Sequence, residues 1–272
     1  MEFEIAKRTQ INISTSIDIE DNLVVRSAKL ALESLKVSAW VRFTLLKRIP
    51  MGAGMGGGSS NAAAALIALL ALIRKMTGKG LPAPEVVRLA ESLGSDVPFF
   101  LYGGTALGLG RGTELYPLPD LPSRAAVVVA SGIHVSTADA YRALNRTLTS
   151  TPESPILREF QTIAWDLDNS SLDQVPLKND FEDAVFGVHP RLAGFVRKLR
   201  RLGAGPALMT GSGSAVFGVF PSVARAREAA AAFAGGLAQP VGFVSRKQYR
   251  RAWRRALGPV AGTSLFAGAR GD

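Results

Sequence analysis

KRIPMGAGMGGGSS, residues 47–60, is the most informative stretch of this sequence. It places five glycines within Gly52–Gly58, then two hydroxyl side chains, directly before the helix-forming run NAAAAL of residues 61–66. Glycine lets a backbone approach a ligand closely and reach positive φ. A helix N-terminus offers unpaired N–H groups at the positive end of a dipole. Together they predict an anion cradle, most often for phosphate. The alternative, a flexible loop before a core helix, is disfavoured because linkers are seldom joined so tightly to a helix.

Two familiar phosphate motifs fit this stretch poorly. No Gly-Lys-Ser/Thr follows the glycines, so it is not a P-loop. Gly52, Gly54 and Gly57 do form a G-x-G-x-x-G pattern. A dinucleotide site then needs a second strand ending in an acidic residue about 20 residues further on. Residues 75–84, KMTGKGLPAP, lead instead into another helix pattern, which disfavours a dinucleotide site.

Three segments in order resemble the motifs of the GHMP kinases, the superfamily of galactokinase, homoserine kinase and mevalonate kinase. The glycine stretch resembles the ATP motif, GSDVPFF at 94–100 the segment with the catalytic Asp, and GSGSA at 211–215 the third motif. DNLV at 21–24 and VSTADAY at 135–141 are similar to one branch of the superfamily. That branch phosphorylates a hydroxyl of 4-diphosphocytidyl-2-C-methyl-D-erythritol in non-mevalonate isoprenoid precursor synthesis. The resemblance covers nearly the whole chain.

The resemblance implies an α+β fold of the GHMP kinase type. Its N-terminal part would be like domain 2 of ribosomal protein S5, and its C-terminal part ferredoxin-like. The implied division is 1–145 for the ATP-binding domain and 146–272 for the C-terminal domain. ATP and Mg²⁺ are the implied cofactors, and the partner is the small-molecule substrate, with the chain a monomer or homodimer.

Site residues follow from the same resemblance. Asp96 would take the proton of the attacking hydroxyl or orient it, although its position alone favours capping of a turn. The residues implied to bind ATP are Asn22, Leu23, Lys47, Pro50, Met51, Gly52, Ala53, Gly54, Met55, Gly56, Gly57, Gly58, Ser59 and Ser60. Those implied to border the substrate are Thr137, Gly211, Ser212 and Gly213.

Several of these residues also have plain structural interpretations. Ser59 and Ser60 are good N-caps, and we expect them both to cap the helix and to ligate Mg²⁺ or the phosphates. Thr137 begins a helix pattern, Asn22 could cap one, and a surface Lys47 is commonplace. Gly211 to Ser214 also fit an ordinary β-turn.

One departure from the family concerns the start of the chain. The family opens with a Pro-Ala-Lys-Ile-Asn-Leu segment that carries a catalytic Lys, followed by a Gly-Tyr-His that holds the cytidine. Neither segment occurs here, and Lys7 lies in a context that fits only superficially, so we interpret Lys7 as a surface residue. The N-terminal domain is therefore expected to be incomplete, through a misplaced start.

Composition narrows the function classes. The 272 residues include no cysteine and two histidines, which excludes thiolate chemistry and Cys- or His-rich metal sites. No signal peptide opens the chain, and the apolar run Ala62–Ile73 is too short to span a bilayer. We therefore expect a cytoplasmic protein without membrane partners.

The positive charge of the chain leaves one alternative class of function open. The net charge is +10, and much of it lies in residues 197–201 and in RKQYRRAWRR at 246–255. Basic helices with interleaved aromatics can bind nucleic acid, whereas a solvated helix face is the commoner outcome. No nucleic acid is expected, but an RNA-binding or non-catalytic protein on an S5-like fold, or another small-molecule GHMP kinase, stays open.

Periodicity predicts the elements. We expect Asp21 to cap a helix that carries Val24, Ala28, Ala31 and Leu35. The other expected helices are 59–76, 84–93, a short one near 156–167, 190–202 and 222–234. The expected strands are 40–45, 125–130, the hairpin pair 207–210 and 215–220, and 241–244.

Overall fold

The computed structural model describes residues 1–144 and 177–258, which divide into two compact units. The first unit comprises residues 1–48, 56–117 and the chain from 245 onward, and the second comprises 49–55 and 118–244. These packing units differ from the sequence domains proposed above. Residues 118–144 pack with the second unit, and the last helix packs with the first. The division of family domains at residue 145 stays a prediction.

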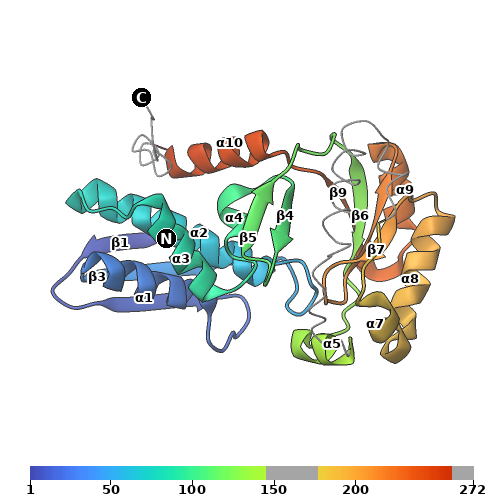
Figure 1. Cartoon of the computed structure of the whole chain (residues 1–272), viewed down its shortest axis with the longest axis horizontal. Coiled ribbons are helices and arrows are strands. Elements are labelled where there is room, and N and C mark those ends of the chain that lie inside the picture. Colours follow the sequence, from blue (N-terminus) through green and yellow to red (C-terminus); the bar gives the residue numbers. More distant parts are fainter. Residues whose placement is uncertain (145–176, 259–272) are drawn as a thin grey trace, which may run out of the picture. The chain divides into compact units, whose positions relative to one another are not determined.

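The first unit is built on a three-stranded sheet in the order β1-β3-β2. Figure 1 labels β1 and β3. β3 pairs antiparallel with β1 and parallel with β2. The strands are β1 (Glu2–Ile5), β2 (Gln10–Thr15) and β3 (Ala39–Leu45), with a separate hairpin of β4 (Ala106–Leu109) and β5 (Glu114–Pro117). The helices are α1 (Leu23–Leu35), α2 (Gly57–Thr77), α3 (Ala83–Leu93), α4 (Phe99–Tyr102) and α10 (Arg246–Leu257).

The core of this unit confirms the expected patterns. Val41 and Phe43 of β3 are buried on one face while Arg42 between them is exposed, because side chains alternate along a strand. These residues pack with the apolar sides of α1 and α2 in one cluster. Lys7 is exposed, as expected.

Helix α2 is the one helix in the described residues that is long and apolar enough, by length and composition, to cross a membrane. The helix extends beyond the apolar run Ala62–Ile73 at both ends, so the length of that run alone does not decide whether the helix could cross a membrane. Of its most apolar stretch, 56% is buried within the protein. Its residues Leu66, Leu69 and Ile73 have no exposed surface and belong to the first unit's core, as in a buried core helix.

The second unit has a four-stranded sheet in the order β7-β8-β6-β9, antiparallel throughout. Its strands are β6 (Ala125–Val129), β7 (Ala207–Met209), β8 (Val216–Phe220) and β9 (Ala238–Gly242). Its helices are α5 (Thr137–Ala143), α7 (Glu182–Val188), α8 (Pro190–Arg201) and α9 (Val223–Ala231), with the short 3₁₀ turn η2 (Ala234–Gly236).

The topology of the second unit is ferredoxin-like. In chain order the strands run β6, β7, β8 and β9, and in the sheet the first strand lies between the fourth and the third. Helices separate β6 from β7 and β8 from β9, whereas β7 and β8 form a hairpin. This is the split β-α-β pattern, in which helix and strand periodicities alternate along the sequence. The expected C-terminal fold is confirmed.

Two expected boundaries need correction, and one expected helix cannot be compared. Asn22 caps α1, with its side chain accepting from the Val24 N–H, whereas Asp21 has φ +47° and pairs with Arg26. The strand expected at 241–244 is β9, which begins three residues earlier, at Ala238. The helix expected near 156–167 lies outside the described residues.

Candidate active site

The implied site residues belong to both units, and each group is described within its own unit. Asn22, Leu23, Lys47, the residues from Gly56 to Ser60 and Asp96 lie in the first unit. The residues from Pro50 to Met55, together with Thr137 and the Gly211–Gly213 turn, lie in the second. The glycine stretch thus continues from one unit into the other after Met55.

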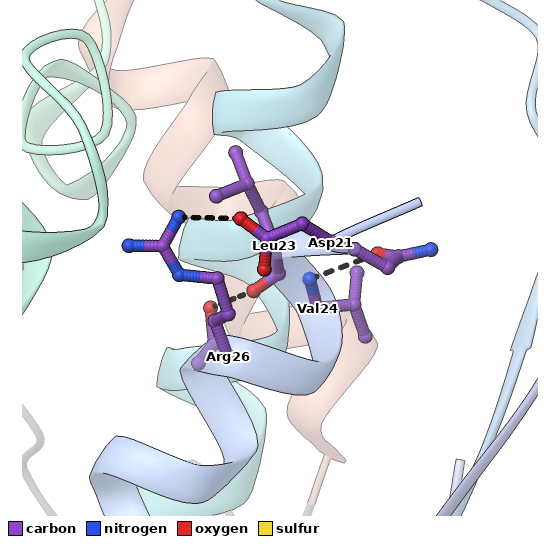
Figure 2. Close-up of polar contacts among 6 residues, drawn as sticks. Asp21, Leu23, Val24 and Arg26 are labelled. Carbon is purple, nitrogen blue, oxygen red and sulfur yellow. Dashed lines mark hydrogen bonds and ion pairs between the residues drawn. The ribbon is translucent and has the colours of Figure 1, made fainter. Parts of the chain in front are cut away.

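The start of α1 is held against α2. The Asn22 side chain accepts from the Val24 N–H at 3.0 Å. Figure 2 shows the ion pair of Arg26 with Asp21. The buried Ser27 hydroxyl donates to the Leu23 carbonyl at 2.7 Å and to the Ala62 carbonyl of α2 at 3.1 Å. A methyl group on Gly58 would lie 3.7 Å from Leu23 Cδ1. Leu23 is therefore brought beside the first turn of α2.

One polar atom of the Asn22 side chain takes no part in capping the helix. Its oxygen is the helix cap, but its Nδ2 is buried and has no hydrogen-bond partner among residues 1–144 and 177–258. A buried donor without an acceptor carries a desolvation cost of about 1–3 kcal/mol. Such a cost is tolerated where a ligand supplies the acceptor, so this atom is a candidate ligand contact.

The first turn of α2 has free backbone donors. Its N-cap is Gly56, with φ +63° and no side-chain cap, so the first N–H groups of the helix lack intrahelical acceptors. The expectation that Ser59 and Ser60 cap the helix was wrong, because both lie inside its first turn. The Ser60 hydroxyl donates to the Gly57 carbonyl at 3.0 Å. The open N-terminus and the two hydroxyls suit an anion.

Asp96 lies in the turn between α3 and α4, as expected. It is exposed, whereas the next residue, Val97, has no exposed surface and anchors the turn. Within the described parts of the chain the Asp96 carboxylate forms no ion pair or hydrogen bond. The carboxylate is therefore free to accept a proton from a hydroxyl.

Lys47 follows β3, where its backbone N–H donates to the Ser16 hydroxyl at 3.0 Å. Partial burial lowers the pKa of the Lys47 ammonium below its usual value, because desolvation disfavours the charged form. A nearby anion would instead raise the pKa of Lys47, because it stabilises the charged form.

In the second unit, the first half of the glycine stretch is docked on the turn after β7. The Ala53 carbonyl accepts from the Thr210 hydroxyl and from the Ala215 N–H, both at 3.0 Å. A methyl group on Gly54 would lie 2.3 Å from the Thr210 carbonyl oxygen and 2.6 Å from the Gly213 nitrogen. Glycine is thus required at both Gly54 and Gly213, since the two backbones touch.

Thr137 and Ser212 also meet in this unit. The Ser212 hydroxyl donates to the Thr137 hydroxyl at 3.1 Å, which joins the start of α5 to the Gly211–Gly213 turn. Thr137 is the first residue of α5, and Ser136 is its cap, so the capping interpretation of Thr137 was wrong.

Sequence reasoning missed His134 and Asn179, which support the two glycine turns together with Ser214 of the 211–215 motif. Ser214, which is buried, donates to the Ile133 carbonyl, and a methyl group on Gly52 would lie 2.2 Å from Nδ1 of the neighbouring His134. Asn179 Nδ2 donates to the carbonyls of Met209 and Gly211, at 2.9 and 2.8 Å. No local pattern marks His134 or Asn179, because their partners are distant in sequence.

Glu182 is a further support of β7. Its carboxylate accepts from the Met209 N–H at 2.7 Å. Burial raises the pKa of Glu182 above its usual value, an effect that the Met209 bond and the nearby Arg200 partly offset.

Within the first unit, the open N-terminus of α2 suits an anion such as a phosphate group. The sequence matches the GHMP kinase N-terminal domain over residues 22–104 and the GHMP kinase C-terminal domain over residues 162–238. The structure of a homoserine kinase from Cytophaga hutchinsonii has the same fold, with a TM-score of 0.68 at 19% identity over 89% of this chain and 84% of that one. The fold is therefore that of the GHMP kinases.

Closer relatives narrow the class. A 4-diphosphocytidyl-2-C-methyl-D-erythritol kinase of Solibacter usitatus is 45% identical over 259 residues, covering 94% of this chain and 79% of the relative. One of Solidesulfovibrio magneticus is 39% identical over 75% of this chain and 68% of the relative. A crystal structure of 4-(cytidine 5'-diphospho)-2C-methyl-D-erythritol kinase has a TM-score of 0.67 at 33% identity, covering 89% of this chain and 84% of that one. The chain belongs to the 4-diphosphocytidyl-2-C-methyl-D-erythritol kinase family.

Proposed function

We propose that this chain is an ATP-dependent kinase that phosphorylates a hydroxyl of 4-diphosphocytidyl-2-C-methyl-D-erythritol, a transferase of isoprenoid precursor synthesis. The observation that carries the proposal is the 45% identity to such a kinase over 94% of the chain. The geometry supports it, since phosphoryl transfer needs positioning and charge stabilisation more than covalent chemistry.

The reaction has one bond made and one broken. The substrate hydroxyl oxygen attacks the γ-phosphorus, the bond from that phosphorus to the β,γ-bridging oxygen breaks, and ADP leaves. Asp96 accepts the proton of the hydroxyl or orients it, a role for which its unpaired carboxylate is suited. This role of Asp96 is proposed from its position in the turn and from the family resemblance.

ATP is proposed to bind along the glycine stretch. The N–H groups at the start of α2 hold its phosphates, and Asn22 and Leu23 contact the adenine, with the Asn22 Nδ2 as donor. Lys47 neutralises phosphate charge. Thr137 and the turn of Gly211 to Gly213 border the second substrate and hold the glycine stretch in place.

Mg²⁺ fits the same place. The described residues hold no cluster of three or more acidic, His or Cys side chains that would bind a metal alone. Mg²⁺ is commonly held by substrate phosphates with few protein ligands, so the Ser59 and Ser60 hydroxyls would complete its shell. When bound, the ion offsets the negative charge that develops on the transferred group.

The remaining proposals concern the setting of the enzyme. We place it in the cytoplasm without membrane partners, since the one helix of membrane length among the described residues belongs to a folded core. The partner is the small-molecule substrate, and the protein acts as a monomer or homodimer.

A substrate panel tests this function. ADP release is measured with 4-diphosphocytidyl-2-C-methyl-D-erythritol, homoserine and mevalonate, each with ATP. The proposal predicts turnover of the first alone, and turnover of another alcohol only would replace it with a different GHMP kinase. RNA binding that weakens with salt, combined with absent ATP affinity, would favour a nucleic-acid-binding protein instead.

A further inference from the structure

Helix α10 turns its aromatic residues inward and its charges outward. Tyr249, Trp253 and Leu257 recur every four residues and are half-buried, and Trp253 and Leu257 pack against the core of the first unit. Its exposed charged side chains are Lys247, Arg250, Arg251, Arg254 and Arg255. The aromatic rings are therefore occupied within the protein, and basic residues predominate on the outer face.

The first turn of α10 is bound to the segment that follows α4. The Tyr249 hydroxyl donates to the Phe100 carbonyl at 2.7 Å. Arg246 donates to the carbonyls of Gly103 and Thr105, at 3.1 and 2.6 Å. A methyl group on Gly103, which has φ +66°, would lie 2.3 Å from Tyr249 Cδ1, so the Tyr249 ring lies directly against this glycine.

The turn that carries Asp96 is continuous with this segment. The Val97 N–H donates to the Gly94 carbonyl at 3.1 Å, and the Phe100 N–H to the Val97 carbonyl at 3.1 Å. Gly103 closes the run by donating to the Phe99 carbonyl at 2.9 Å. A displacement of Phe100 is therefore transmitted to Asp96 through consecutive backbone hydrogen bonds.

Phe100 also touches the start of α2. A methyl group on Gly56 would lie 2.8 Å from Phe100 Cζ, so the ring packs against the N-cap of that helix. Phe100 thus joins the Asp96 turn to the proposed phosphate-binding turn, while its carbonyl is held by α10. Burial raises the pKa of Tyr249, which keeps its hydroxyl a donor at neutral pH.

We propose that Tyr249 is a positioning residue for phosphoryl transfer. Through Phe100 it fixes the Asp96 turn relative to the Gly56 start of α2. The inference rests on the proposed function, since it assigns Asp96 the role of base. A misplacement of about 1 Å can cost about 100-fold in rate, so loss of one hydrogen bond in this support is expected to lower kcat about tenfold.

Amide hydrogen exchange tests the structural half without any assay of activity. Tyr249→Phe removes the hydroxyl and retains the ring. Tyr116→Phe is the matched control, because Tyr116 is 53% exposed and lies in β5 of the same unit. The proposal predicts faster exchange at the amides from Val97 to Gly103 in Tyr249→Phe only. Unchanged exchange there would overturn it.

A double-mutant cycle tests the functional half. Tyr249→Phe should lower kcat about tenfold with the KM for ATP nearly unchanged, whereas Tyr116→Phe should retain parental kcat. In an Asp96→Asn background, Tyr249→Phe should lower kcat no further, because the group it positions is gone. An equal tenfold loss in both backgrounds, or parental kcat in Tyr249→Phe, would overturn the positioning role.

The exchange measurement and the double-mutant cycle together distinguish a failure of this inference from a failure of the proposed function. A parent protein that turns over no substrate would contradict the function, and the exchange measurement then decides alone whether Tyr249 holds the Asp96 turn. An active parent with unchanged kcat in Tyr249→Phe would contradict the positioning role and leave the function intact.

Discussion

Asn22 has a structural role and is also a candidate ligand contact. Its oxygen caps α1, and among the described residues its buried Nδ2 has no hydrogen-bond partner. The family resemblance identified the residue, but it did not indicate that the two atoms have separate tasks. That distinction requires knowing which backbone N–H lies nearby, and this depends on the turn at Asp21, whose φ is +47°.

Asn22→Asp separates the two tasks. A carboxylate still accepts from the Val24 N–H and suits a helix N-terminus, so stability should change little. The buried donor is lost, so ATP affinity should fall about tenfold, in the range of one hydrogen bond to a ligand. Calorimetric titration with ATP measures the effect. Asn22→Ala is the comparison, since it should lose both the cap, at about 1 kcal/mol, and the affinity.

Gly54→Ala tests the contact between the two glycine turns. The new methyl group would meet the Thr210 carbonyl at 2.3 Å, so residues 49–55 must shift away from the turn after β7. Overpacking of this kind costs about 1–3 kcal/mol, and ATP affinity should fall with it.

Gly236→Ala is the control for backbone strain alone. Its φ of +69° matches the +70° of Gly54, but nothing lies within 4 Å of the added methyl group. Both variants carry the strain of about 1 kcal/mol, and only Gly54→Ala should lose ATP binding. Equal ATP affinities in the two variants, measured by calorimetry, would show that the contact does not shape the site.

At the scale of elements, the sequence predicted regular structure well and its ends less well. β3, α1 and α3 follow from apolar periodicity, because one face of each is buried. The start of α2 was misplaced because Ser59 and Ser60 are strong caps by type, whereas Gly56 takes that position through its left-handed backbone. The predicted start of β9 was too late in the sequence. Only its first residue, Ala238, is buried, so the alternation of buried and exposed residues is weak.

Glu182 lies at the start of α7 and binds β7. We expect it to make the stability of the folded protein depend on pH. Burial raises the pKa of Glu182 in the folded state above its ordinary value of 4.5. Between 4.5 and the raised pKa the folded protein binds more protons than the unfolded one, so the stability from this group falls as pH rises through that window.

Glu182→Gln removes this titration while its amide oxygen still accepts from the Met209 N–H. The parent should lose stability relative to the variant as pH is raised from 4 to 7. Urea unfolding of both proteins across this range measures the difference. A constant difference in unfolding free energy across the range would show that Glu182 does not titrate differently on folding.

At the scale of the whole molecule, the class of fold was predictable and the long-range contacts were not. Three motifs in order indicated a GHMP kinase, and that resemblance implied the ferredoxin-like sheet, while the mixture of helices and strands in the second half predicted only an α+β pattern. The hydrogen bond from the Thr210 hydroxyl to the Ala53 carbonyl joins residues 157 positions apart, and no local sequence pattern predicts it. The support of the Asp96 turn by α10 was hidden for the same reason, since charge dominates that helix in the sequence.

The central claim is that this chain transfers a phosphoryl group with Asp96 as its base. The most direct measurement is kcat on 4-diphosphocytidyl-2-C-methyl-D-erythritol for the parent and for Asp96→Asn, alongside ATP affinity by calorimetry. Asn has the shape of Asp and keeps the exposed turn intact, so ATP should bind both proteins equally. The account predicts a kcat about 10²–10⁴-fold lower in the variant. A kcat within a few-fold of the parent would contradict it and would leave Asp96 as a turn residue.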